Sequence, residues 1–321
     1  MKNKSNLEKY LFELRRITEH RTEGVEKEIR KVYKKVLKEL KSFLGDLFIK
    51  YSENGVLDYS ALYRAGLDAR FLDEVDLQLD DISAVERQQM RSLIDETYQQ
   101  CYDGMRTAVE RAAGDMALVK ESLAGIEAAT PEVIAAAVNN PIHGLTLNER
   151  LERKRRDVIY NIRQEISVGI SNGDRFETIA NRVARTLEGD YKKAIRIVRT
   201  EAHRAREQGN HDGAAKIDEA LRNGTSGMVM VKIWRTMKDE RVRPNRRYKT
   251  KKGWKNGKPG KYDHQKMDGV EIPVNEIFAL PSGAKTAAPG QSGVAGEDIN
   301  CRCYLSYKLK KVSLKTKEGK R

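Results

Sequence analysis

The stretch NGTSGMVMVKIW, residues 223–234, marks the point where the pattern of the chain changes. Upstream of it, apolar residues recur every three or four positions, as they do on one face of an α-helix. Inside it, apolar residues alternate from Val229 to Ile233, which is the period of a β-strand. Further extended segments are expected at 269–273 and 303–309. The sequence therefore predicts a mostly α-helical N-terminal two-thirds, made of long helices and a helical bundle, followed by a small α+β C-terminal domain with an antiparallel sheet.

The helical part contains two long periodic regions, 6–50 and 59–113. The apolar stripe of the first serves either internal packing or contact with a partner protein. After a connector at 141–147, three helices are expected at 148–170, 175–187 and 191–221. Glu188-Gly189-Asp190 is expected to form the turn between the last two, because Gly favours helix ends. We expect four parts: a helical N-terminal region (1–140), a second helical segment (141–225), a basic α+β part (226–309) and a basic tail (310–321).

The positive charge is concentrated in the last third of the chain. Residues 226–321 contain 23 Lys and Arg against 9 Asp and Glu, which equals the net charge of +14 for the whole chain, so the first 225 residues are neutral. Such a field attracts polyanions, most simply nucleic-acid phosphate, although it also fits a solubilising loop. We expect non-specific contact with double-stranded DNA. The candidate contact residues are Arg246, Arg247, Lys249, Lys251, Lys252, Lys255, Lys258 and Lys261.

The composition is that of a globular protein without a membrane anchor. There is no run of 18 apolar residues, and the N-terminus passes directly into a charged segment, so we expect neither a membrane span nor a secretory signal and place the protein in the cytoplasm. Cys101 is expected to be a small core residue. A disulfide between Cys301 and Cys303 would be strained, so reduced thiols are expected. No cofactor is predicted.

Four groups of residues between positions 141 and 305 carry a recognisable order and spacing. They are His143-Gly144-Leu145-Thr146-Leu147-Asn148-Glu149-Arg150; Arg199-Thr200-Glu201 with Arg204-Ala205; Trp234-Arg235-Thr236 with Asp239-Glu240-Arg241-Val242-Arg243; and His264, Met267-Asp268-Gly269, Phe278, Pro289-Gly290 and Asn300-Cys301-Arg302-Cys303. Together they resemble the phage Mu F-like minor head proteins, also called head morphogenesis proteins.

The resemblance implies a structural protein of the phage head. Its expected place is near the portal vertex, with roles in head assembly and in DNA packaging or ejection. The partners it implies are the portal protein, the scaffold and the major capsid protein, with no membrane. It implies localisation in the virion after assembly in the bacterial host cytoplasm. The domain also resembles one found fused to toxins, but no further domain is expected after Leu309.

Eleven residues of the last two groups are expected to form a structural motif: Trp234, Asp239, Arg241, Arg243, His264, Asp268, Gly269, Asn300, Cys301, Arg302 and Cys303. In this interpretation Asp239, Asp268 and Asn300 fix loop backbone to the strands, and the arginines pair with the carboxylates, because buried charges need partners. No metal is predicted. The alternative is a structural zinc bound by His264, Cys301 and Cys303, for which Asp239 or Asp263 would be a poor fourth ligand.

No catalytic residues are predicted. The alternative class is a metal-dependent, nuclease-like DNA-processing enzyme, with His264 as the base and a metal held by Asp239 and Asp268. Glu201 lies among several arginines, which is typical of a helix ion pair. His203 and His211 lack the four-residue spacing of a helical metal pair and are expected to be ordinary helix residues.

Overall fold

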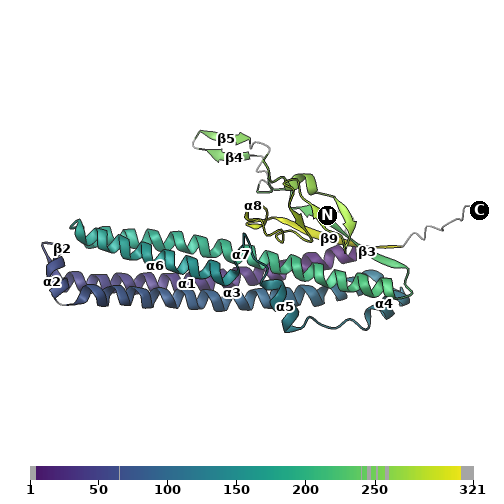
Figure 1. The fold of residues 1–321 in the computed structure, drawn as a ribbon, viewed down its shortest axis with the longest axis horizontal. Helices are drawn as coiled ribbons and strands as arrows, with labels where there is room; N and C mark the ends of the chain where they lie inside the picture. The colour runs from purple at the N-terminus through teal and green to yellow at the C-terminus, as the bar shows by residue number, and fades with distance from the viewer. Residues whose placement is uncertain are drawn as a thin grey trace, which may run out of the picture. The chain divides into compact units, whose positions relative to one another are not determined.

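The computed structural model describes residues 5–64, 66–239, 241–243, 247–250, 252–256 and 260–311. Long helices form the first two-thirds and an antiparallel sheet lies in the last third (Figure 1), so the predicted fold class is confirmed.

The helices are α1 (Asn6–Tyr51), α2 (Tyr59–Arg64), α3 (Leu67–Ala113), α4 (Ala117–Leu123), α5 (Pro131–Val138), α6 (Leu147–Ser171), α7 (Phe176–Asn223), the 3-10 helix η1 (His264–Met267) and α8 (Ala295–Asp298). The strands are β1 (Ser52–Glu53), β2 (Val56–Leu57), β3 (Met228–Thr236), β4 (Arg247–Thr250), β5 (Gly253–Asn256), β6 (Glu271–Pro273), β7 (Phe278–Ala279), β8 (Lys285–Thr286) and β9 (Cys303–Lys311).

Helix α7 differs from the prediction. The Glu188-Gly189-Asp190 segment was expected to be a turn, but α7 runs through it without a break. Asp190 is buried, and its carboxylate accepts hydrogen bonds from Lys154 Nζ (2.6 Å) and Tyr33 Oη (2.5 Å). A glycine inside a helix costs only about 1 kcal/mol, so the buried contacts of the neighbouring Asp190 override the local turn signal.

Helix α6 begins one residue earlier than predicted because its first turn closes a capping box. Thr146 Oγ1 accepts from the backbone N–H of Glu149, and a Glu149 carboxylate oxygen accepts from the backbone N–H of Thr146 at 2.7 Å. Each contact satisfies an amide that the helix itself leaves unpaired. None of the described helices is both long and apolar enough to cross a bilayer.

The chain forms two compact units. Unit 1 contains Met1–His20, Ile94–Gly144 and Thr200–Arg321, and unit 2 contains Arg21–Leu93 and Leu145–Arg199. One boundary between the two units falls after Gly144. The other boundaries fall inside the continuous helices α1, α3 and α7, where helical periodicity does not change and the sequence gives no signal.

Unit 2 is helical, and the apolar stripe of α1 packs inside it. Ile29, Val36 and Leu40 are each at most 4% exposed. A polar cluster is buried in the same unit: Lys154 Nζ donates to Glu86 (3.0 Å to each oxygen) and to Asp190, and Tyr33 Oη donates to Glu86 at 2.8 Å. Burial raises the pKa of Glu86, and Lys154 and Tyr33 oppose that rise. One cation therefore balances two carboxylates that are shielded from water.

In unit 1, β3 is the central strand of the sheet β6-β3-β9, and both of its pairings are antiparallel. Trp234, Met230 and Tyr307 are at most 1% exposed. They share one apolar core with residues from the ends of the long helices, namely Leu7 of α1, Met105 and Val109 of α3, and Ile217 and Leu221 of α7. The sheet is thus packed against segments of α1 and α3 that lie far from it in sequence, and against the end of α7, which directly precedes β3.

We predict that Lys154→Met lowers the free energy of unfolding by about 3–5 kcal/mol, because Glu86 and Asp190 would remain buried without their cation. Urea denaturation measures this. Lys192→Met is the matched control: its ion pair with Glu188 is also 2.6 Å long, but both side chains are more than 60% exposed. The control should lose less than about 1 kcal/mol. Equal losses in the two variants would contradict the importance of the buried cluster.

A second prediction concerns Lys232, whose side chain is buried in β3 and donates from Nζ to Ala287 O at 2.9 Å. Burial lowers the pKa of Lys232 to about 8. An unfolded lysine keeps its proton up to about pH 10.4, so unfolding takes up a proton between these values and raising the pH in this window stabilises the folded protein.

We expect Lys232→Met to remove this pH dependence. The melting temperature of the variant minus that of the wild type should be most positive at or below pH 8 and should fall as the pH rises to about 10.5. Loss of the hydrogen bond to Ala287 O shifts the difference in melting temperature by the same amount at every pH. The change of this difference with pH is therefore the diagnostic quantity. A difference in melting temperature that stays constant between pH 8 and about 10.5 would refute the lowered pKa of Lys232.

Candidate functional site

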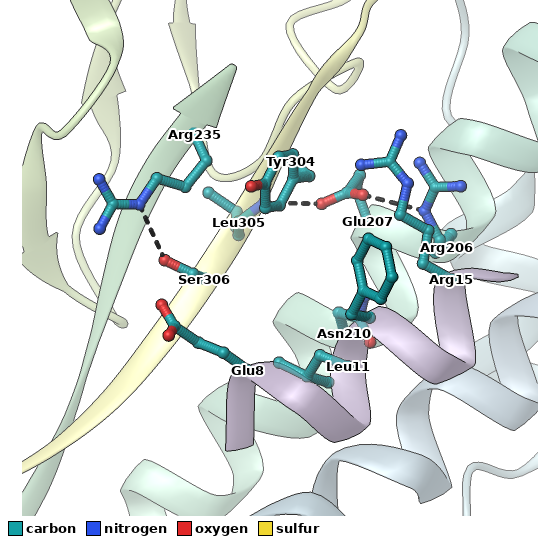
Figure 2. Close-up of a pocket in the computed structure, with 11 residues that line it drawn as sticks. Glu8, Leu11, Arg15, Arg206, Glu207, Asn210, Arg235, Tyr304, Leu305 and Ser306 are labelled. Carbon is teal, nitrogen blue, oxygen red and sulfur yellow. Dashed lines mark hydrogen bonds and ion pairs between the residues drawn. The ribbon is translucent and has the colours of Figure 1, made fainter. Parts of the chain in front are cut away.

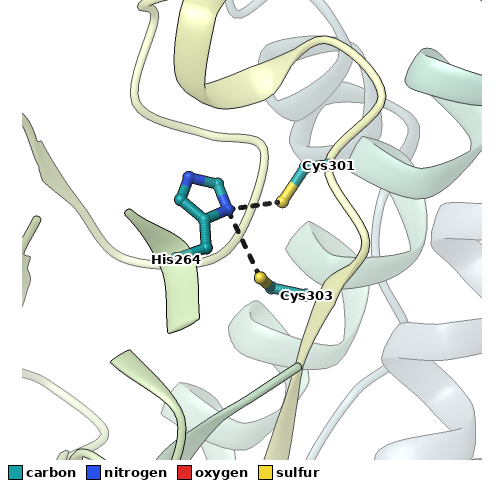
Figure 3. Close-up of side chains that lie close together, drawn as sticks. All are labelled: His264, Cys301 and Cys303. Atoms are coloured by element: carbon teal, nitrogen blue, oxygen red, sulfur yellow. Dashed lines mark hydrogen bonds between the residues drawn. The ribbon is translucent and has the colours of Figure 1, made fainter. Parts of the chain in front are cut away.

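The centre of the predicted motif is a buried group formed by His264, Cys301 and Cys303 (Figure 3). His264 opens the short helix η1, and the two cysteines lie immediately before and at the start of β9. His264 Nδ1 is 3.6 Å from Cys301 Sγ and 3.3 Å from Cys303 Sγ. Both thiols are free. The structure therefore brings His264 next to two cysteines that lie 37 and 39 positions further along the chain.

The other face of the His264 ring contacts Glu297 of α8. Its Nε2 is 2.5 Å from a carboxylate oxygen of Glu297, and both side chains are at most 2% exposed. Burial acts to lower the pKa of His264, but its contacts with Cys301 and Glu297 outweigh burial and raise it. The indole ring of Trp234 packs edge-on against the imidazole, with ring centroids 5.8 Å apart.

The two thiols differ in acidity because they contact one another. The hydrogen bond with Cys303 is the main cause that lowers the pKa of Cys301, with further lowering by His203 and His264. The same thiol–thiol contact, together with burial, raises the pKa of Cys303. Cys301 is thus the sulfur that favours the thiolate.

The charged residues of the motif fix the loops around this group. Asp239 forms an ion pair with Arg302 and accepts from the backbone N–H of Arg241 at 3.1 Å. Burial opposes ionisation of Asp239, but the Arg302 contact keeps its pKa below the usual value. Arg243 donates to the backbone carbonyls of Glu297 (2.5 Å) and Ile299 rather than to a carboxylate.

Asp268, Gly269 and Asn300 make backbone connections. Asp268 Oδ1 accepts from the N–H of Thr236 at 2.9 Å, and the N–H of Gly269 donates to Trp234 O at 2.8 Å. Gly269 and Asn300 both have positive φ, at 93° and 57°, a conformation that Gly adopts freely and Asn tolerates.

The site also contains residues that sequence reasoning did not select. Glu297 lies in the four-residue helix α8, which is too short to show a helical period in the sequence. His203, expected to be an ordinary helix residue, is 8% exposed and faces Cys301, with its Nδ1 2.7 Å from Arg206 Nη2. Glu201 pairs with Arg204 at 3.0 Å, as its neighbours in sequence indicated. Arg204 in turn donates to Gly290 O and Asn140 O, both at 2.8 Å.

Asp239 and Asp268 do not join His264. Among the described residues, the group of His, Cys, Asp and Glu side chains that converge closely enough to hold a metal is His264, Cys301 and Cys303. Asp268 instead contacts Thr236 and, at 3.4 Å, Lys238. The structure therefore provides no geometry for the nuclease-like arrangement within the part of the chain that it describes.

A small cavity of about 50 Å³ lies between the start of α1, the middle of α7 and β9 (Figure 2). Glu207, Arg235 and Tyr304 are among the residues that line it. Arg235 Nε donates to Ser306 Oγ at 3.3 Å, and the N–H of Leu305 donates to Glu207 at 2.9 Å. This volume suits water rather than a substrate.

The basic insertion contains the antiparallel hairpin β4–β5, in which Lys249 pairs with Trp254 and Lys255 with Tyr248. Arg247 begins β4, Lys252 lies in the connecting turn, and Lys261 follows the hairpin. Lys252 and Lys261 are exposed. Arg246, Lys251 and Lys258 lie outside the described residues.

Comparison with known proteins finds the same family that the four groups of residues between positions 141 and 305 indicated. The family described as "Phage Mu protein F like protein" matches residues 160–306. The minor head protein GP7 of Bacillus phage SPP1 is 30% identical over 305 residues, covering 95% of this chain and 86% of that protein. The NAD(+)–arginine ADP-ribosyltransferase EFV of Enterococcus faecalis is 30% identical over 172 residues, which is 54% of this chain but 30% of that protein. No solved structure matches significantly. The resemblance inferred from the motifs is confirmed.

Proposed function

The chain belongs to the phage Mu F-like minor head proteins, and we propose that it acts at the portal vertex of a tailed-phage or prophage head. In this proposal it contacts the portal protein, with the scaffold and the major capsid protein as further partners, during assembly in the bacterial host cytoplasm. The observation that carries the proposal is the extent of the likeness to a minor head protein, which includes residues of both units. The likeness to the ADP-ribosyltransferase covers too little of that enzyme to transfer its activity.

The proposed role includes handling of DNA during packaging or ejection. Its support is the charge distribution: the whole net charge of +14 lies in residues 226–321, and 11 basic residues against one acid lie between Arg241 and Lys266. Lys and Arg are frequent in the sequence of the hairpin and its flanks, and phosphate contacts made by such residues need no base recognition. Binding is therefore expected to be independent of DNA sequence.

Salt-dependent binding to duplex DNA tests this role. Replacing Lys249, Lys251, Lys252, Lys255 and Lys258 by Gln should reduce the magnitude of the slope of log K against log salt by up to about 4.5, because each lost phosphate contact contributes about 0.9. Fluorescence anisotropy on two duplexes of unrelated sequence measures the slope.

The matched control replaces five lysines of α1, namely Lys31, Lys34, Lys35, Lys38 and Lys41, by Gln. It makes the same change in net charge and should keep the wild-type slope. Equal slopes in all three proteins would exclude the insertion as the DNA contact. Incubation with plasmid and Mg²⁺ or Mn²⁺ addresses the enzyme alternative, which cleavage abolished by His264→Ala would support.

Cross-linking in purified heads tests the place at the portal vertex. We expect peptides of this chain to cross-link to the portal protein, and quantitative mass spectrometry to find far fewer copies of this chain than of the major capsid protein. Heads assembled in the absence of the portal protein, after deletion of its gene, provide the control. These heads should lack the chain. Incorporation at the normal level in those heads would contradict a portal-proximal position.

A further inference from the structure

We propose that His264, Cys301 and Cys303 bind a zinc ion, through Nδ1 of the histidine and the two sulfurs. The three ligand atoms lie within 4.8 Å of one another. Zinc bond lengths of about 2.3 Å to sulfur and about 2.0 Å to nitrogen give a nitrogen–sulfur edge of about 3.5 Å in a tetrahedral site. The observed separations of 3.6 and 3.3 Å lie on either side of this value. The inference does not depend on the proposed role at the portal.

Glu297 sets His264 in the form that a metal requires. The carboxylate accepts the Nε2–H, so in the neutral ring the lone pair is on Nδ1, the nitrogen that lies next to both sulfurs (Figure 3). A carboxylate on the far nitrogen of a metal-binding histidine fixes the ring and strengthens it as a ligand. Ser282 Oγ donates to the other oxygen of Glu297, so this orienting residue is itself held in place.

Each sulfur also has one N–H group next to it. The Trp234 indole N–H contacts Cys303, and the His203 ring contacts Cys301, and both contacts act to lower the pKa of the thiol concerned. Neither Trp234 Nε1 nor His203 Nε2 has a nitrogen or oxygen partner among the described residues. An N–H group next to sulfur stabilises the negative charge that the sulfur carries when it is bound to a metal.

His203 contributes as a hydrogen-bond donor rather than as the fourth ligand. An Arg side chain is always a donor, so the contact of Arg206 Nη2 with His203 Nδ1 places the ring hydrogen on Nε2. That nitrogen therefore has no lone pair to offer a metal. The described residues supply three ligands, and we assign the fourth position to a water molecule.

A zinc ion here would connect three segments that have little regular structure between them: η1, the turn after α8, and the start of β9. Zn²⁺ would also compensate the negative charge that arises when both cysteines bind it as thiolates next to the Glu297 carboxylate, a region in which Arg243 is the nearby cation. Borderline-soft ligands of the Cys and His type select zinc over magnesium or calcium.

Metal analysis of the full chain, purified in reductant without added metal, tests the site. We expect about one zinc per chain in the wild type, and loss of that zinc in Cys303→Ala. Cys101→Ala is the matched control, because it removes the other buried thiol of the protein and leaves the site intact, and it should keep its zinc. Zinc that stays in Cys303→Ala, or copper in place of zinc, would overturn the proposal.

Two measurements avoid dependence on variants that fail to fold. Cobalt(II) added to apo wild-type protein should give thiolate-to-metal charge-transfer absorption and intense tetrahedral d–d bands, and a mercurial should release one zinc as the site thiols react. Glu297→Gln should keep these spectra but bind zinc about 10–100-fold more weakly, and His203→Gln should leave the ligand-field pattern unchanged. Absence of the charge-transfer band in the wild type would refute the site.

Discussion

Backbone pairing along both edges of β3 determines which distant parts of the chain meet. On one edge β9 pairs with it from Met228↔Lys311 to Thr236↔Cys303. On the other edge β6 pairs with it, and Trp234 extends the contact because its N–H donates to Val270 O and its carbonyl accepts from Gly269 N–H. A slip of one residue would turn Trp234 and Cys303 to the opposite faces of the sheet, and the thiols would then no longer meet His264.

Helix α7 holds this register with polar side chains on one of its faces. Thr200, Glu207 and Asp218 are separated by seven and eleven residues, which are two and three helical turns. Each accepts from a backbone N–H of the sheet region: Thr200 from Asn300 (3.4 Å), Glu207 from Leu305 (2.9 Å) and Asp218 from Met230 (2.7 Å). A buried amide without a partner costs about 1–3 kcal/mol, so sliding α7 along the sheet would leave several amides unsatisfied.

The sequence predicts what local periodicity encodes, and fails where partners are distant. The long helices, β3 and β9 follow from apolar spacing, and the order of the motifs identified the family. Helix α7 was divided at Gly189 because the buried partners of Asp190 come from other helices. Glu297 and His203 were missed for the same reason. Glu297 lies in the very short helix α8 and His203 in the long helix α7, and the local sequence of neither helix indicates a contact with His264 or Cys301.

The structural motif of charged residues and the proposed zinc site at His264, Cys301 and Cys303 can exist in the same fold. Asp239 pairs with Arg302 on one side of Cys301, and Arg243 donates to the carbonyls of Glu297 and Ile299 on the other side. These contacts use neither the His264 ring nor a sulfur. The loops are therefore ordered before any ion binds. Ordering of ligand-bearing loops is normally a large part of the free-energy cost of building a metal site. In this protein hydrogen bonds and ion pairs already hold these loops, so the three proposed ligand atoms, His264 Nδ1 in η1 and the sulfurs of Cys301 and Cys303, lie close together in the fold.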